Sequence, residues 1–331
     1  MIKFKTDVEL SEFPKKIGYR HQFLMIGSCF AENLGIFLQE RALPIQINPF
    51  GVLYNPQSIA NCLELILTRK IFTDQDLFYF NGLYHSFSHH SRYSGSDKPL
   101  LLKRINAEAA EAYQNLKGGS HLFITFGTSW VFQHKERGTV VSNCHKLPAA
   151  TFNHSRLSVD QIIKIWIPLI EQLKLINPKL HLVFTVSPIR HLKDGAHGNQ
   201  LSKSILLLAI DEIISIYGNE LITYFPSYEI ILDELRDYRF YARDMTHLSE
   251  LAIDYIREKF LAALMEPEAI PISDEAGKLL QSIKHKPFNS KEEHYITFLN
   301  TQFKKMEELQ KKYSFVNFQN LRGKFDEKII N

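Results

Sequence analysis

The sequence contains few cysteines and no long apolar run, and each scarcity excludes a class of protein. Among its 331 residues are three cysteines, Cys29, Cys62 and Cys144. Such an odd, sparse count is no disulfide framework and favours a reducing compartment. The opening stretch MIKFKTDVELSEF is charged, and no apolar run approaches the ~18–20 residues that cross a bilayer. We therefore expect no secretory signal, no membrane span and a cytoplasmic location.

An excess of charge of one sign is also lacking. The 39 Lys and Arg residues nearly balance the 36 Asp and Glu residues, so the formal net charge is +3. Since no block of Lys and Arg with interleaved aromatic residues stands out, we expect no nucleic-acid partner. The composition, 45% hydrophobic and 12% aromatic, is that of a globular chain long enough to bury a sizeable core.

Short apolar runs alternate with helical patterns over most of the chain. We expect strands at 23–26, 45–47, 121–126, 181–186 and 221–225. Apolar residues at helical spacing predict helices at 31–40, 58–68, 106–117, 158–175, 201–217 and from about 247 onward. This order predicts an α/β fold, a three-layer α/β/α sandwich around a five-stranded, doubly wound parallel sheet. Ligands of such sheets bind at the carboxyl ends of the strands.

Two regions interrupt or follow this alternation. Residues 71–105 are irregular and rich in Phe, Tyr, His and Ser, which is typical of an insertion. Beyond residue 265 the sequence resembles a connector and then shows helical patterns at 275–283 and 290–313, the second opened by a capping box from Ser290 to Glu293. We expect a main domain at 1–265 and a helical extension at 266–331 that packs on that domain or on a partner.

The first expected strand ends in Gly27-Ser28-Cys29, where a helix begins. Glycine permits a sharp turn, and the helix N-terminus favours an anion, which lowers the pKa of a thiol placed there. A serine at this point needs an adjacent base to become a nucleophile. Taken alone, the stretch is better explained by Ser28 as a helix cap and Cys29 as a small buried residue.

The loops after the next three strands add polar groups at the same edge of the sheet. The loop from Asn48 to Pro56 contains Gly51, whose backbone N–H is a candidate donor. Gly127-Thr128-Ser129 follows the third strand, and taken alone it is an ordinary turn with two hydroxyls. Arg190 and His191 follow the fourth strand and are candidates for binding an anionic or polar substrate, although such residues are more often solvated.

An Asp-x-x-His pattern follows the last strand. An aspartate three residues before a histidine can accept a hydrogen bond from Nδ1–H, which leaves Nε2 as a base. Asp244 and His247 have this spacing. The combination of a nucleophile pair after the first strand and this pattern after the last one is more informative than either motif alone.

These residues resemble the SGNH (GDSL-type) hydrolase superfamily. The stretch GSCFA resembles the naming motif of the GSCFA family within it, and the similarity extends over residues 20–265 through stretches such as NPFGVLYNP, FGTSWV, TVSPIRH and RDMTH. The resemblance implies the α/β/α sandwich described above. It also implies that Cys29 stands at the nucleophile position, Ser28 at the usual aspartate position, and Asp244 and His247 at their usual positions.

The resemblance also assigns the oxyanion hole, with two departures from the superfamily pattern. Gly51 matches the glycine of the second block, and Gly127 and Ser129 match the glycine and asparagine of the third. Cysteine for serine changes the nucleophile, and serine for asparagine weakens the oxyanion hole. If the turn is shifted by one residue, Ser28 attacks instead of Cys29; the register from Gly27 favours Cys29.

Two polar clusters are further candidates for contact with a substrate. His85, His89 and His90 lie in the insertion, where the spacing of Cys and carboxylate residues does not support a metal site. The stretch Asn143 to Lys146 is expected to line the pocket. The residues that we expect to contact the substrate are Asn55, Thr128, His90, Arg190, His191 and His145.

The sequence therefore predicts an ester hydrolase that forms a covalent acyl-enzyme on a small acyl ester, an O-acetylated carbohydrate being compatible with the aromatic insertion. An acyltransferase that takes acetyl from a thioester such as acetyl-CoA is an alternative, because a thiol exchanges thioesters at little cost. A non-catalytic binding protein on the same fold is the second alternative. We expect no resident metal or other cofactor.

Overall fold

Five parallel strands form the central sheet of the computed structural model, which describes residues 5–285 and 293–330. The strands are β1 (Phe23–Gly27), β2 (Ile45–Ile47), β5 (His121–Phe126), β9 (His181–Val186) and β10 (Ile222–Tyr224). Their order across the sheet is β10-β9-β5-β1-β2, and every neighbouring pair is parallel. The predicted α/β fold with a five-stranded parallel sheet is confirmed, and each strand lies within a residue or two of its expected place.

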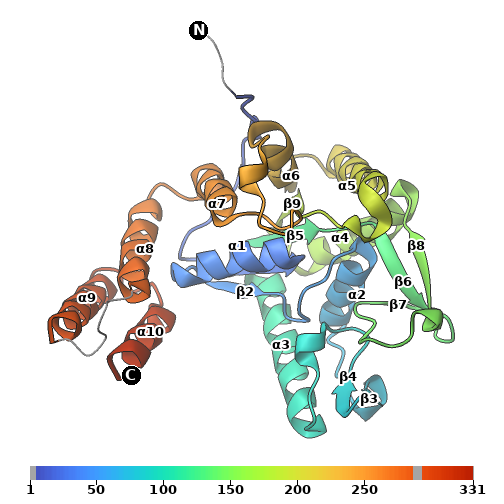
Figure 1. Cartoon of the computed structure of the whole chain (residues 1–331), viewed down its shortest axis with the longest axis horizontal. Coiled ribbons are helices and arrows are strands. Elements are labelled where there is room, and N and C mark those ends of the chain that lie inside the picture. Colours follow the sequence, from blue (N-terminus) through green and yellow to red (C-terminus); the bar gives the residue numbers. More distant parts are fainter. Residues whose placement is uncertain (1–4, 286–292, 331) are drawn as a thin grey trace.

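Alternate residues of each strand belong to different sides of the sheet. Phe23 and Met25 pack into one apolar cluster, whereas Leu24 and Ile26 pack into the other. Because side chains alternate along a strand, continuous apolar runs such as FLMI require cover on both faces. The first cluster includes helices α1 (Cys29–Glu40) and α7 (Glu250–Leu264); the second includes α2 (Pro56–Leu67), α3 (Lys98–Gly118), α4 (Val159–Ile176) and α5 (Gly195–Tyr217) (Figure 1).

The strand order reverses direction between β1 and β5. The chain runs outward from β1 to β2, then returns to β5 on the other side of β1 and continues to β9 and β10. At such a switch point the loops that follow the two central strands diverge and leave a crevice at their carboxyl ends. Those loops are Gly27-Ser28-Cys29 and Gly127-Thr128-Ser129.

Several helices begin at other residues than the apolar pattern predicts, because the N-cap residue determines where each helix starts. Helix α3 starts at Lys98, eight residues early, since the Asp97 side chain accepts a hydrogen bond from the Leu100 N–H and a proline follows at the first turn. Helix α7 starts at Glu250, where Ser249 is the cap. His247 therefore precedes this helix, on a turn, and does not open it.

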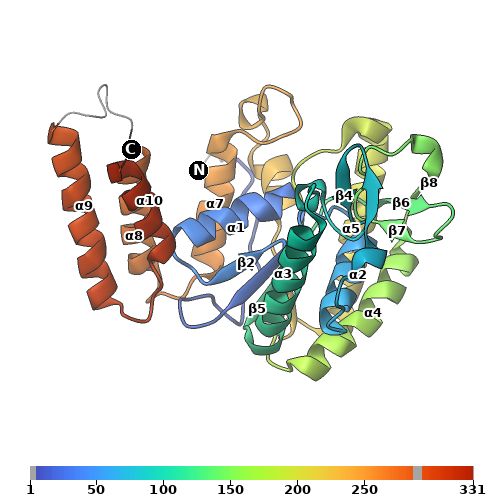
Figure 2. The same ribbon diagram turned by 90° about the horizontal axis from the view of Figure 1, so that it is seen from below.

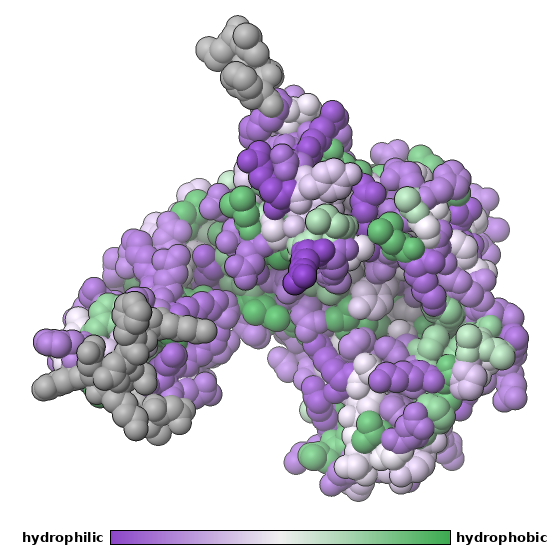
Figure 3. All heavy atoms as spheres, in the orientation of Figure 1, coloured by the Kyte–Doolittle hydropathy of each residue, from purple (hydrophilic) through white to green (hydrophobic). Residues whose placement is uncertain are grey.

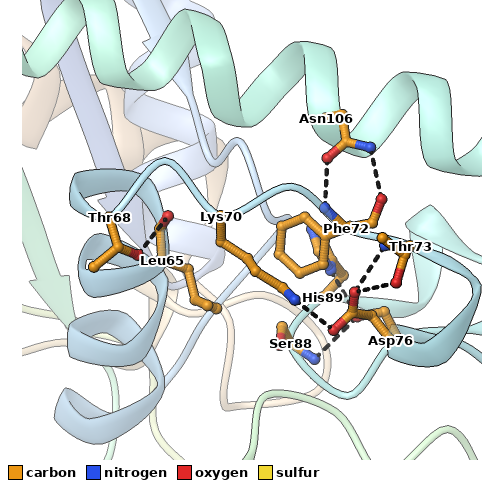
Figure 4. A network of polar contacts seen from close by, with 10 residues as sticks. Leu65, Thr68, Lys70, Phe72, Thr73, Asp76, Ser88, His89 and Asn106 are labelled. Atoms are coloured by element: carbon orange, nitrogen blue, oxygen red, sulfur yellow. Dashed lines mark hydrogen bonds and ion pairs between the residues drawn. The ribbon is translucent and has the colours of Figure 1, made fainter.

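The expected insertion contains a short hairpin and is tied to the main body. Strands β3 (Phe78–Phe80) and β4 (Leu83–His85) pair antiparallel. Asn106 of α3 hydrogen-bonds both the N–H and the carbonyl of Phe72, and Lys70 pairs with Asp76 at 3.2 Å (Figure 4). The irregular sequence thus has defined local structure, which the sequence did not predict.

A second antiparallel sheet was also not predicted. It consists of β7 (Val140–Val141), β6 (Trp130–His134) and β8 (Phe152–Arg156). On one face the His154 ring stacks between Trp130 and Phe132, with centroid distances of 4.6 and 4.3 Å. Polar residues and histidines interrupt the apolar pattern of these strands, so they do not have the continuous apolar character of the central strands.

The first of the C-terminal helices packs on α1, and the other two pack on the first and on each other. They are α8 (Ile270–Lys284), α9 (Glu293–Lys312) and α10 (Gln319–Ile330), the last of which was not predicted; the expected capping box at Ser290 lies outside the described residues. Their apolar residues belong to the cluster that includes α1 and α7. Glu40, the last residue of α1, pairs with Lys284 of α8 at 3.0 Å and with Lys324 of α10 at 2.7 Å. Figures 1 and 2 show these helices on the side of the molecule opposite β6, β7 and β8.

The remaining element lies between β10 and α7. A short helix, α6 (Ser227–Glu229), continues into a π-helical turn over Ile230–Glu234.

Hydrophilic residues cover most of the face seen in Figure 3. Among the described helices, none combines the length and the apolar character that crossing a bilayer requires.

Candidate active site

The turn after β1 separates the two candidate nucleophiles. Gly27 has φ +148°, and a Cβ there would lie 2.3 Å from the Thr125 carbonyl oxygen, so only glycine fits. Ser28 is fully buried, and its Oγ accepts a hydrogen bond from the Phe30 N–H at 3.3 Å. Ser28 is therefore the N-cap of α1, as the alternative explanation of the sequence had it. Cys29 is the first residue of the helix and is partly exposed.

Cys29 lines a cavity of about 430 Å³ at the carboxyl ends of the strands. One wall comes from the antiparallel sheet, through Trp130, Phe132 and His154. Six of the predicted site residues line this cavity: Cys29, Asn55, Thr128, Arg190, His191 and His247. The fold thus brings together residues from five separate loops, as expected for a switch point.

Asp244 and His247 form the predicted pair. The Asp244 Oδ2 lies 2.6 Å from His247 Nδ1, and its Oδ1 accepts hydrogen bonds from the backbone N–H groups of Thr246 and His247. The hydrogen bond from the His247 ring, followed by those from the backbone, lowers the pKa of Asp244 below its usual range. An ionised carboxylate at Nδ1 holds the proton on that nitrogen and leaves Nε2 as the acceptor.

The three expected oxyanion residues do not line the cavity. The Gly51 N–H donates to the Asn48 carbonyl at 2.7 Å, and the Gly127 N–H donates to the Tyr54 carbonyl at 2.7 Å. Ser129 is fully buried, and both its N–H and its Oγ hydrogen-bond Ser202 Oγ. Gly51 lies in the loop after β2, and Gly127 and Ser129 lie in the turn after β5. The expectation that their donors face a ligand is corrected, because those donors are already used in the turns.

Asn55 provides a donor that the predicted oxyanion set lacks. It is the N-cap of α2, where its Oδ1 accepts from the Ser58 N–H at 2.8 Å. In the described part of the chain, its Nδ2 amide has no hydrogen-bond partner, and Asn55 lines the cavity. The cap thus fixes the orientation of the side chain and leaves the amide N–H₂ available.

Lys203 is a residue of the site that the sequence did not reveal. It is fully buried on α5, and its Nζ donates to the Gly127 and Ser187 carbonyls at 2.6 Å each. These carbonyls belong to the residues that follow β5 and β9. Burial lowers the pKa of Lys203 to about 7, and the neighbouring Cys29 acts in the opposite direction. A lone lysine in an amphipathic helix gives no sequence signal of burial.

Burial also sets the protonation of the groups around the cavity. Burial raises the pKa of the Cys29 thiol, although the backbone N–H groups at the start of α1 favour its thiolate. The thiol therefore needs a base to become a nucleophile. His191, whose ring packs edge-on against Tyr54 at 5.6 Å, has its pKa lowered to about 4 by burial and by Lys203. Its ring is neutral at physiological pH.

Two predicted substrate contacts lie outside the cavity. His90 packs beneath Gly51, and its Nδ1 accepts a hydrogen bond from the Arg92 N–H. His145 Nε2 lies 2.9 Å from the Ser86 carbonyl oxygen, so this ring joins the insertion to the 143–146 loop. These two expectations are corrected; of that loop, Asn143 and Cys144 reach the cavity. Over residues 5–285 and 293–330, no His, Cys, Asp and Glu residues are grouped as metal ligands.

Fold and site together define an α/β protein with a cysteine, a histidine and its aspartate partner at the switch point of a parallel sheet. The chain belongs to the GSCFA family, whose model matches residues 22–260. The model described as "GSCFA domain protein, C-terminal domain" matches residues 276–331. A comparison with curated proteins finds no match.

Solved structures of two carbohydrate esterases are similar to parts of this chain. One is a family two carbohydrate esterase from Clostridium thermocellum in complex with cellohexaose, with 11% identity and a TM-score of 0.37, covering 75% of this chain and 64% of that one. The other is an acetyl xylan esterase from the rumen bacterium Butyrivibrio proteoclasticus, with 9% identity and a TM-score of 0.36, covering 74% and 63%. In both cases the alignment spans less than two-thirds of the esterase chain.

Proposed function

We propose that this chain is a cysteine-dependent member of the SGNH hydrolase-like superfamily that hydrolyses small acyl esters through an acyl-enzyme. The observation that carries the proposal is the 2.6 Å contact between Asp244 and His247 Nδ1 beside a cavity that Cys29 and His247 share. Such an oriented base next to a nucleophile at a helix N-terminus is the arrangement that acyl transfer requires.

The proposed reaction has two halves. His247 Nε2 takes the proton of the Cys29 thiol while Sγ bonds to the ester carbonyl carbon. The resulting oxyanion collapses, the carbon–oxygen bond to the alcohol breaks, and His247 gives its proton to the departing alkoxide. Water then attacks the thioester, with His247 as base. The carbon–sulfur bond breaks, the carboxylic acid leaves, and the thiol is restored.

The proposed oxyanion donors are the backbone N–H of Cys29 and the Nδ2 amide of Asn55. Cys29 is the first residue of α1, where N–H groups have no acceptor within the helix. Asn55 is fixed by its cap and lines the same cavity. Donors held in place by other contacts stabilise a developing negative charge without reorganisation. Asn55 thus takes the role that sequence register gave to Gly51 and Ser129.

An O-acetylated carbohydrate is the substrate that we propose within this class. The rings of Trp130 and Phe132 line the cavity and offer apolar surface to a sugar. Transfer of an acetyl group from acetyl-CoA to a hydroxyl remains the alternative reaction of the same thiol, because the first half-reaction then exchanges one thioester for another.

The experiment is a search for the acyl adduct by intact mass. The protein is incubated with p-nitrophenyl acetate or with acetyl-CoA and quenched in acid. We expect an added acetyl group that is absent from Cys29→Ala and present in Ser28→Ala, because Ser28 is a buried cap. Ser28→Ala is expected to lose about 1 kcal/mol of stability.

The outcomes separate the candidate functions. An adduct from the ester that turns over in water supports the hydrolase, and an adduct from acetyl-CoA that turns over only with an added hydroxyl acceptor supports the transferase. An adduct lost in Ser28→Ala but kept in Cys29→Ala would transfer the nucleophile to Ser28. No adduct from either donor would favour a non-catalytic binding protein.

A further inference from the structure

Arg190 lies between two cavities. It follows β9 and lines both the cavity of Cys29 and a second cavity of about 380 Å³ bordered by the π-helical turn and the turn before α7. Its backbone N–H donates to the Thr246 carbonyl at 3.4 Å, which places it beside His247. The two cavities therefore meet at the residue next to the proposed base.

The guanidinium of Arg190 has no partner among the described residues. The other charged groups of the second cavity are paired: Arg236 with Asp233 at 3.0 Å, and Asp237 with Arg239 at 3.5 Å. Because a partly buried cation without a counterion is unfavourable, its retention at this point calls for a ligand that supplies the negative charge.

A second cation of the Cys29 cavity is likewise unpaired. The Lys193 ammonium lies 4.9 Å above the Phe132 ring, and within the described chain it makes no ion pair. Of the carboxylates nearby, Asp244 is hydrogen-bonded to His247, whereas Asp194 lies 3.8 Å from His154 Nδ1, beyond hydrogen-bond distance. Among the described residues, the cavity thus presents two cations without an ion pair, Arg190 and Lys193, against one lining carboxylate, Asp194.

We propose that the ester's alcohol part carries an anionic oxygen group, a carboxylate or a phosphate, which binds Arg190 and Lys193; this rests on the proposed function. Planar guanidinium groups match the oxygens of both anions in a bidentate manner. The alcohol part is the one concerned, because His247 protonates the leaving alkoxide and Arg190 is held against its neighbour Thr246. The leaving group therefore departs toward Arg190.

The test compares release of acetate from two aryl acetates, 4-acetoxybenzoate, which carries a carboxylate, and methyl 4-acetoxybenzoate, in which that carboxylate is a neutral methyl ester. After division by the hydroxide-catalysed rates, we expect kcat/KM to favour the anionic ester by about tenfold in 50 mM NaCl and less in 500 mM. Arg190→Gln is expected to bring this ratio close to one, and Lys193→Gln to lower it about threefold. Arg137→Gln removes an exposed arginine outside both cavities and is expected to keep the wild-type ratio.

A binding experiment makes the result independent of catalysis. Isothermal titration uses 4-hydroxybenzoate and phenyl phosphate as anionic probes and methyl 4-hydroxybenzoate as the neutral one. Tighter binding of either anion, lost in Arg190→Gln, supports the inference, and the preferred probe tells carboxylate from phosphate. Hydrolysis of both esters at equal normalised rates, without preferential anion binding, overturns it. Anion binding that depends on Arg190 without any hydrolysis would refute the proposed function alone.

Discussion

The two sides of the candidate active site are built in opposite ways. The nucleophile side consists of strand-end turns in which Ser28 and Ser129 are fully buried, and the buried Lys203 of α5 donates to the Gly127 carbonyl of one of these turns. The base side is a surface turn, where the side chains of His247 and Asp244 are 59% and 51% exposed. In the proposed reaction, the buried side fixes where attack occurs, and the exposed side contributes proton transfer with little effect on folding.

The largest effect is expected on the exposed side. His247→Ala should lower kcat/KM for p-nitrophenyl acetate by about 10³-fold, because the Cys29 thiol then has no base. The melting temperature should stay unchanged, since the side chain is mostly exposed and its ring contacts are local. Steady-state kinetics and calorimetry measure the two quantities.

His197→Ala is the matched control, because His197 is exposed on α5 and lies outside the cavity. It is expected to change neither the rate nor the melting temperature. A marked fall in the melting temperature of His247→Ala would show that the turn before α7 supports the fold, and the contrast between the two sides would be lost.

An intermediate effect is expected on the buried side. Lys203→Met leaves the Gly127 and Ser187 carbonyls without their donor and should lower the free energy of unfolding by about 3 kcal/mol. It also removes a charge that favours the Cys29 thiolate, so alkylation of Cys29 by iodoacetamide should slow at neutral pH. Urea titration and alkylation kinetics are the measurements.

Lys164→Met provides the comparison, since Lys164 is exposed on α4. Its unfolding free energy should match the wild type. If Lys203→Met were equally stable and Cys29 reacted at the wild-type rate, the lysine would have no part in holding the strand ends.

The smallest effect per residue is expected on the stability of the fold at acidic pH. Burial lowers the pKa of His89 and His121 to about 3 in the folded chain, whereas an unfolded histidine titrates near its usual value of about 6.5. The unfolded state thus binds more protons below pH 6.5, so stability is complete above that pH and is lost as the pH falls. Each of these histidines should lower the free energy of unfolding by about 2 kcal/mol between pH 6.5 and pH 5.

Urea titrations at pH 7.5, 6.5 and 5.0 measure this loss. His89→Gln should flatten the profile relative to the wild type, because one depressed histidine is then absent. Stability that does not change between pH 7.5 and 5.0 would contradict the neutral, buried state of these rings.

The sheet and part of the site were predictable for identifiable reasons. Runs such as FLMI and HLFITF are apolar at every position, which is the pattern of strands covered on both faces, and their order fixed the parallel sheet. The pair Asp244 and His247 was predictable because both partners lie within one short turn. Local patterns identify such features since the contacts that matter are close in sequence.

Other features depend on contacts that no local pattern encodes. The N–H groups of Gly51 and Gly127 were assigned to a ligand, yet each is used by a backbone carbonyl of the same or a neighbouring loop. The sequence around Lys203 is typical of a solvated helix residue, yet the packing of the fold buries this side chain completely. Asn55 was expected to contact substrate. Its role as a fixed donor follows from the hydrogen bond that its Oδ1 accepts from the Ser58 N–H, which orients the side chain.

Helix α1 connects the candidate active site with the C-terminal helices. The helix begins at Cys29 and ends at Glu40, which forms ion pairs with Lys284 and Lys324. Twelve residues of α-helix span about 18 Å and hardly compress. The candidate nucleophile and the C-terminal helices therefore lie at opposite ends of one continuous helix.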